Sequence, residues 1–259
     1  MTSHSLSLSV TPDYSACAYG VRPDLATSHQ ETFRNIASAG TWFTGAQRVA
    51  IAHEARAARD CDLCAQRKAA LSPMAVNGVH DGPGELEAVL IDAIHRVITD
   101  PGRLSRSWCD GLLDRDVIDD AAFAELVSVA VVTHAIDLFA IALGSDIAPF
   151  PEPEPGAPAR QRPQTAVLEG AWIAQIPVGE AGGNDWSDLY GEREVVPQIG
   201  RALSLVPAEV RQLQAIAGAH YMELDYVIDP AYCTPGRVLD RQQMELIASR
   251  VSSINDCFY

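Results

Sequence analysis

Two cysteines, Cys61 and Cys64, form the most closely spaced pair of thiols in the sequence. On a helix, residues three apart lie on one face, so the two sulfurs can meet at a distance compatible with a disulfide. Flanking basic side chains, among them Lys68, the sequence's one lysine, favour the thiolate, and the flanking acidic side chains oppose it. The pair therefore predicts redox chemistry or metal binding, with two ordinary reduced thiols as the alternative.

A zinc site needs four ligands, and Cys61 and Cys64 have no second pair at the spacing of a zinc finger. We therefore expect no cofactor and no bound metal, although His53 or His80 could complete a metal site in space. His53 and Glu54 precede Cys61 by about two helical turns, so they are candidates to support the chemistry of the thiols.

A second candidate site is the final stretch of the sequence, in which Glu245 precedes Cys257 by eleven intervening residues. This stretch resembles the alkylhydroperoxidase D family, where a Glu stands at the same spacing before a Cys-x-x-Cys pair that a His follows. By resemblance, Glu245 belongs to a proton relay, Cys257 is one redox cysteine, and Tyr259 occupies a relay position. The match is incomplete, because the sequence ends at Tyr259, before the positions of the second cysteine and the His.

The amino-terminal half resembles the same alkylhydroperoxidase D and carboxymuconolactone decarboxylase-like superfamily more loosely. Its Phe-Thr-Gly-Ala-Gln-Arg segment at 43–48, the Ala-rich stretch after it and the Cys61–Cys64 pair form a second helix-and-cysteine unit. In this unit Val49 occupies the position of the family's Glu, and Lys68 that of its His. We expect Cys61 and Cys64 to be catalytic, with Lys68 in a supporting role.

The resemblance implies a thiol-dependent hydroperoxide reductase, an antioxidant peroxidase whose thiolate becomes a sulfenic acid and then a disulfide. The implied partners are a small hydroperoxide, a thiol reductant and further copies of the chain in a homo-oligomer. One alternative is a helical oligomerisation or binding scaffold without activity. Another is a carboxymuconolactone decarboxylase-like enzyme.

Composition and charge restrict the partners further. A formal net charge of -15 argues against nucleic acid, because phosphate backbones are held mainly by Lys and Arg. No membrane association is expected, since no apolar run approaches the ~20 residues that span a bilayer. Residues 1–10 lack the features of a secretory signal, so we expect a cytoplasmic protein whose thiols are mostly reduced.

The elements expected around these residues are helices. A capping box at Thr44 and Gln47 and a stop at Ser72-Pro73 predict a helix over 44–71. Three- and four-residue apolar spacing predicts helices over 86–97, from Pro207 and from Asp240. The apolar stretch 121–143, with Gly144 as its stop, predicts a helix at the centre of the amino-terminal part, and residues 169–197 are expected to be an ordered loop. Six prolines between Ala148 and Pro163 indicate an extended linker. We therefore predict an all-α, alkylhydroperoxidase D-like array with an amino-terminal part (1–147), a linker (148–165) and a carboxy-terminal part (166–259).

Overall fold

The computed structural model describes residues 11–259 except 115–116, 224–225, 227–228, 230, 232–235, 256 and 258–259. The predicted all-α class is confirmed: among these residues the one β pairing is an isolated bridge between Val167 and Gln175. The α-helices are α1 (Pro23–Ala37), α2 (Gly45–Ala57), α3 (Asp62–Ala69), α4 (Ala88–Thr99), α5 (Arg106–Leu113), α6 (Asp120–Ala142), α7 (Gly183–Tyr190), α8 (Gln198–Arg201), α9 (Pro207–His220) and α11 (Arg241–Ile254). Short 3-10 turns η1 (Ala58–Asp60), η2 (Pro73–Ala75), η3 (Pro101–Arg103) and η4 (Gly179–Gly182) join some of them.

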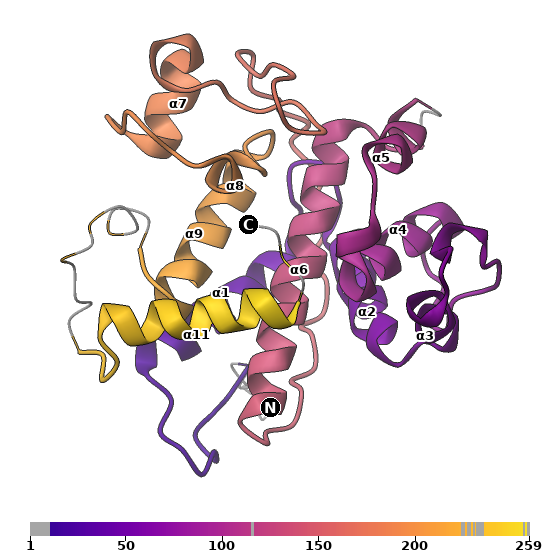
Figure 1. Ribbon diagram of the computed structural model, residues 1–259, viewed down its shortest axis with the longest axis horizontal. Coiled ribbons are helices and arrows are strands. Elements are labelled where there is room, and N and C mark those ends of the chain that lie inside the picture. Colours follow the sequence, from indigo (N-terminus) through magenta and orange to yellow (C-terminus); the bar gives the residue numbers. More distant parts are fainter. Residues whose placement is uncertain are drawn as a thin grey trace, which may run out of the picture.

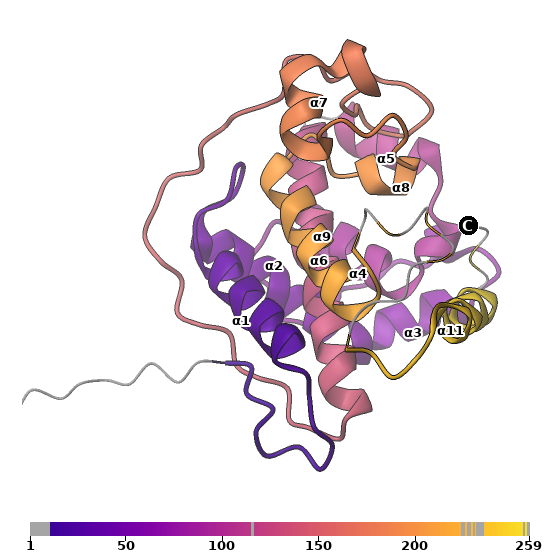
Figure 2. The same cartoon turned by 90° about the vertical axis from the view of Figure 1, so that its left-hand side faces the viewer.

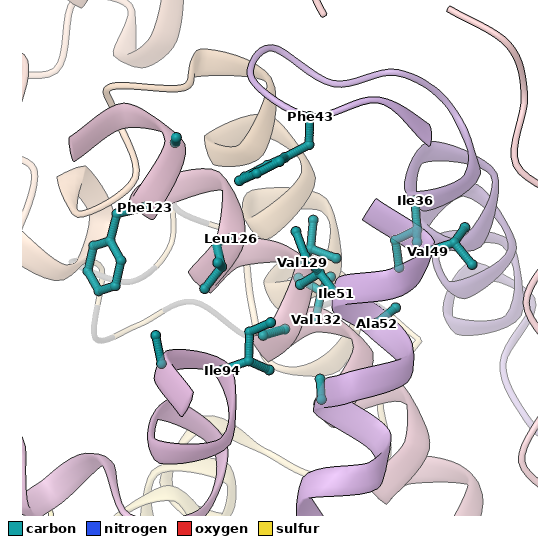
Figure 3. Packing of buried hydrophobic residues seen from close by; sticks show 14 of the residues in the cluster. Ile36, Phe43, Val49, Ile51, Ala52, Ile94, Phe123, Leu126, Val129 and Val132 are labelled. Carbon is teal, nitrogen blue, oxygen red and sulfur yellow. The ribbon is translucent and has the colours of Figure 1, made fainter. Parts of the chain in front are cut away.

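Helix α6 is the centre of the array, as its apolar sequence predicts. Helices α2 and α4 pack against it on one side, and α1 and α9 contact it from the other (Figure 1). Figure 3 shows the core at these contacts, where side chains from four helices and the α1–α2 turn interlock. The labelled residues are Ile36, Phe43, Val49, Ile51, Ala52, Ile94, Phe123, Leu126, Val129 and Val132.

By length and composition α6 is also the one helix among the described residues that could cross a membrane, contrary to the expectation that no segment approaches that length. However, 61% of its most apolar window is buried inside the protein. Burial by neighbouring helices is the ordinary reason for an apolar helix in a folded core.

The predicted helix over 44–71 is only partly correct. Its start is confirmed, because Thr44 and Gln47 form a capping box at the first turn of α2. The helix then tightens into η1, stops at Cys61, whose backbone is extended (φ -74, ψ 122), and restarts as α3. The two cysteines therefore do not share a continuous helix: Cys61 is the N-cap residue of α3, and Cys64 lies in its first turn.

The other predicted helices are confirmed: α4 and α6 begin and end within two residues of the predicted bounds, and α9 and α11 begin within one residue of Pro207 and Asp240. Gly144, at φ +68, follows the end of α6 as expected. The loop predicted over 169–197 is partly wrong, since it contains η4 and α7. Helix α7 lies in that segment because Trp186, Leu189 and Tyr190 form a small core with Val210 of α9.

The Pro-rich segment runs outside the helices, along α1 and α2 (Figure 2). The chain beyond it returns to the array, where α9 packs on α1 and α6. A buried ion triplet reinforces this junction: Arg48 of α2 pairs with Glu125 of α6 and with Glu209 of α9, the latter at 2.8 Å. Gly40 is needed beside it, because a Cβ there would lie 1.9 Å from the Glu125 carboxylate.

Candidate functional site: a buried cluster of two cysteines and two histidines

Four side chains from three parts of the chain meet where α3 and α4 lie side by side (Figure 1). Cys61 and Cys64 come from the first turn of α3, where the break after η1 turns both sulfurs toward α4. His95 comes from α4, and His80 from the extended chain that joins α3 to α4. Their four ligand atoms all lie within 4.8 Å of one another.

The distances in this cluster are those between the sulfurs and the Nδ1 atoms of the two imidazoles. His80 Nδ1 lies 3.5 Å from Cys61 Sγ and 3.6 Å from Cys64 Sγ. His95 Nδ1 lies 3.3 Å from Cys64 Sγ. The two rings are stacked at a tilt, with centroids 4.1 Å apart. Both histidines thus present the same ring nitrogen to one point between the sulfurs.

A carboxylate stands behind each histidine. Glu54 Oε2 lies 3.2 Å from His95 Nε2, and Asp92 Oδ1 lies 3.1 Å from His80 Nε2. Each carboxylate accepts a hydrogen bond from the Nε2–H of its histidine and so orients the ring with Nδ1 toward the sulfurs, where Nδ1 can bind a metal ion that displaces any proton on it. Arg67 Nη1 also donates to Asp92 Oδ1, at 2.6 Å. Because Arg67 Nη1 and His80 Nε2 both donate to this oxygen, the 3.0 Å distance between the two nitrogens is a contact between two donors and not a hydrogen bond.

The backbone of the loop over the cluster completes its hydrogen bonding. The N–H of Asp81 points to Cys61 Sγ at 3.5 Å, and that of Gly84 donates to Glu54 Oε1 at 2.7 Å. Gly82 is required by close approach, because a Cβ there would lie 2.4 Å from Glu54 Oε2.

The cluster is shielded from solvent. Cys61 and Cys64 are 2% and 4% exposed, and His95 and Glu54 are fully buried. No other group of three His, Cys, Asp or Glu side chains in the described part of the chain is close enough to hold a metal ion.

The electrostatics of the cluster favour a cation beside the sulfurs. Burial lowers the pKa of His80, but its hydrogen bonds to Asp92 and to the two sulfurs outweigh burial and raise that pKa to about 10. Burial raises the pKa of Cys61, but hydrogen bonds from the Asp81 N–H, Cys64 and His80 outweigh it, and the net effect lowers the Cys61 pKa. Without a metal, a proton on His80 supplies the positive charge.

Comparisons with family models, curated proteins and solved structures find no match to this chain.

Of the predicted amino-terminal site residues, the structure brings Cys61, Cys64 and Glu54 together and leaves His53 and Lys68 outside. His53 lies on the other face of α2, where its ring meets Phe150 edge-on at 4.9 Å. Lys68 is exposed. The side chains that contact the sulfurs are those of His80 and His95, so the supporting roles pass to these two histidines.

The carboxy-terminal candidates are not part of this cluster. Glu245 pairs with Arg241 at 3.1 Å and hydrogen-bonds to Tyr221, whose pKa burial and Glu245 raise to about 12. Cys257 is exposed, has a free thiol and follows the end of α11 at Ile254. Tyr259 lies outside the described residues, so its proposed role as a relay stays a prediction.

Two residues that complete the site, His95 and Asp92, escape the sequence analysis, and Arg67 enters it only as one of the basic side chains that flank the cysteines. Asp92 and His95 are three residues apart on α4, so they share one face, which is the available sequence signal. His95 is flanked by Ile94, which belongs to the apolar stripe of the helix, and it therefore resembles a core position until the fold places it against Cys64.

Proposed function

We propose that this chain is a zinc-binding protein, with Zn²⁺ held by Cys61 Sγ, Cys64 Sγ, His80 Nδ1 and His95 Nδ1. The spacing of the ligand atoms carries the proposal. A tetrahedral site with Zn–S of about 2.3 Å and Zn–N of about 2.0–2.1 Å places neighbouring sulfur and nitrogen ligands about 3.5 Å apart. Three of the four S···N distances are 3.5, 3.6 and 3.3 Å, and all four ligand atoms lie within 4.8 Å of one another.

The donor set favours Zn²⁺ over other metals. Two thiolates and two imidazoles in a tetrahedron are typical of zinc, whereas Mg²⁺ and Ca²⁺ prefer oxygen ligands. Two thiolates cancel the charge of the ion, so the buried centre is neutral. Glu54 and Asp92 then supply the carboxylate–histidine–metal relay that holds ligating imidazoles in other zinc proteins.

The role that fits this site is structural. All four coordination positions come from protein side chains, three of them on buried residues and the fourth from His80, whose side chain is 7% exposed. A catalytic zinc, in contrast, keeps one position for water or substrate. The ion would join the first turn of α3, the 70–87 chain and α4 at a place where the local core consists of Cys61, Leu63, Cys64 and Val76. Metal coordination would replace the apolar packing that so small a cluster lacks. This proposal departs from the sequence-based expectation of no metal.

The test is the metal content of the protein purified without added metal or chelator, measured by elemental mass spectrometry. We expect about one zinc per chain, and after exchange with Co²⁺ the absorption spectrum of a tetrahedral thiolate complex. Cys64→Ser should lose the metal, and Cys109→Ser, which alters a buried thiol of α5 away from the cluster, should keep it. A wild-type protein without a transition metal, even after refolding with zinc, would refute the proposal.

The second candidate function is the thiol-dependent hydroperoxide reductase of the alkylhydroperoxidase D type. One observation favours it: Glu54, His95 and Cys64 form a continuous chain of polar contacts, the arrangement needed to move a proton to or from a thiol. It would act in a reducing cytoplasm with a thiol reductant, in a homo-oligomer. Repeated turnover of a hydroperoxide by metal-free protein with dithiothreitol, abolished in Cys61→Ser, would support it; zinc-dependent stability without turnover would leave the structural role.

A further inference from the structure

The chain between α3 and α4, residues 70–87, covers the cluster; we call it the cover segment. Its apolar side chains mostly face outward: Leu71 and Val79 are 103% and 90% exposed. Val76 packs on the small core around the cysteines, and Leu86, at the end of the segment, packs on the main core. A segment with so little apolar burial has little local stability of its own.

Polar contacts hold the cover segment in place, and most converge on the cluster. His80 reaches both sulfurs, and the Asp81 N–H points to Cys61. Two further anchors are to residues directly beside the ligands: Arg67 Nε donates to the Val76 carbonyl at 3.0 Å, and the Asp62 N–H donates to the Asp81 carboxylate at 2.8 Å. Nearer the two ends of the segment, Arg103 Nη1 donates to the Ala70 carbonyl and the Gly84 N–H donates to Glu54 Oε1, each at 2.7 Å. The position of the middle of the cover segment, around His80 and Asp81, therefore depends on the state of the two sulfurs.

The same two sulfurs are placed to form a disulfide with each other. Cys61 is the N-cap residue and Cys64 the third residue of α3, and their ligand atoms belong to a group that spans at most 4.8 Å. A disulfide needs about 2.05 Å between the sulfurs, whereas two thiolates on one tetrahedral zinc lie about 3.8 Å apart, so the two states exclude each other.

We propose that the zinc site is a hydroperoxide-sensitive switch: oxidation of Cys61 and Cys64 to a disulfide ejects Zn²⁺ and releases the cover segment. This inference rests on the proposed zinc site and names its regulation. It differs from a peroxidase in its result, which is the loss of the metal ion and the release of the cover segment and not the turnover of hydroperoxide.

The chemistry balances as a two-electron oxidation. One thiolate attacks the terminal oxygen of a hydroperoxide, an S–O bond forms as the O–O bond breaks, and the departing alkoxide or hydroxide takes a proton to give an alcohol or water. The second thiolate attacks the resulting sulfenic sulfur, the S–S bond forms, and hydroxide leaves with a second proton as water. Two thiolates are oxidised, one hydroperoxide is reduced, and Zn²⁺ keeps only His80 and His95, two neutral ligands.

Burial of the sulfurs sets the class of oxidant. With Cys61 and Cys64 2% and 4% exposed beneath the cover segment, hydrogen peroxide can reach them with smaller movements of the chain than a bulky organic hydroperoxide needs. We expect hydrogen peroxide to react at least several-fold faster than cumene hydroperoxide.

The experiment begins with zinc-loaded full-length protein, whose metal content is measured first, and titrates it with hydrogen peroxide in the presence of a chromogenic zinc indicator. We expect one Zn²⁺ released per hydrogen peroxide consumed, a Cys61–Cys64 disulfide in the peptide map, and faster amide hydrogen exchange confined largely to the cover segment. Dithiothreitol with added zinc should reverse all three changes, and Cys109→Ser should behave as the wild type.

The outcomes separate the two proposals. Protein that holds zinc and retains it after stoichiometric oxidation, or releases it without forming the disulfide, would overturn the switch and leave the zinc site standing. Release and disulfide formation with unchanged exchange in residues 70–87 would overturn the release of the cover segment. Protein that binds no zinc would overturn both the switch and the proposed function.

Discussion

Two pairs of histidines lie close together in the part of the chain that the structure describes, and they differ in what surrounds them. His80 and His95 turn Nδ1 toward two sulfurs and Nε2 toward two carboxylates. His29 and His220 instead face each other directly, with their Nε2 atoms 2.6 Å apart, and the other nitrogen of His29 meets the Tyr14 hydroxyl. Among the described contacts, anionic side chains meet the first pair and not the second.

The difference appears in the proton affinities. The carboxylate and sulfurs around His80 raise its pKa to about 10, whereas burial and the neighbouring His220 lower the pKa of His29 to about 4. Proximity of two imidazoles therefore does not make a metal site. Thiolates on one side and carboxylates on the other make the His80–His95 pair attract a cation, and the His29–His220 pair, against Phe139, excludes one.

The largest expected effect is the loss of a zinc ligand from one pair and not from the other. His95→Gln should bind far less than one zinc and lower Tm by about 10 °C or more, because a structural zinc contributes directly to folding free energy. His29→Gln should keep the metal. Elemental analysis and thermal unfolding with and without a chelator check this; equal zinc contents in the two variants would erase the distinction.

Removal of the carboxylates behind the ligands should have an intermediate effect. Glu54→Gln and Asp92→Asn keep the side-chain shapes but weaken the hold on the imidazoles, so each should reduce zinc affinity by about 10- to 100-fold, or about 1.4–2.7 kcal/mol. Competition with a zinc indicator measures the affinity. Asp110→Asn, which touches a surface ion pair with Arg106, serves as the control and should leave affinity unchanged. Wild-type affinity in both variants would show that the carboxylates do not support the ligands.

The second histidine pair predicts a smaller, pH-dependent effect. The pKa of His29 is lowered in the folded state. Below about pH 6.5 the His29 side chain therefore binds a proton more readily in the unfolded chain than in the folded protein. Stability should therefore rise with pH between about 4 and 6.5, by about 1–2 kcal/mol after allowance for solvent screening. Urea unfolding across this range should show a shallower slope for His29→Gln than for the wild type. An identical slope would mean that His29 is not the group responsible.

The smallest effect is expected at the exposed cysteine. Cys257→Ser should change stability by less than about 0.5 kcal/mol and leave zinc content unaltered, because Cys257 is exposed and lies beyond the end of α11. Cys257 should also be alkylated well before Cys61 and Cys64 in zinc-loaded protein, as timed peptide mapping would show. Loss of zinc in this variant would show that Cys257 affects the Cys61–Cys64 site, although no described contact joins them.

The helical architecture could be predicted from the sequence because its signals are local. The capping box at Thr44, the apolar α6 followed by Gly144, and Asp240 before α11 each act within a turn or two of chain. The interruption at Cys61 escaped prediction because no proline or glycine marks it. Helix α7 escaped because it is short and depends on a contact with α9.

The candidate site was predictable only in part, for a physical reason. The spacing of Cys61 and Cys64 identifies them as candidates, and Glu54 is a candidate because it lies about two helical turns before Cys61. His80 occurs in an exposed polar stretch and His95 in a buried helix face, and nothing local indicates that tertiary packing brings both rings to the sulfurs. Of the two cysteine sites that the sequence suggests, the described contacts enclose only the Cys61–Cys64 pair.

All four proposed ligands and both supporting carboxylates lie between Glu54 and His95. This short span has a consequence for the order of folding. A growing chain carries the complete set once α4 has been synthesised, before α6 and α9 exist to bury the helices. Zinc bound at that stage would close a loop at modest entropic cost and hold α3 beside α4 while the core forms. Refolding with zinc should accordingly be faster than refolding in chelator, and docking of α6 should follow metal binding.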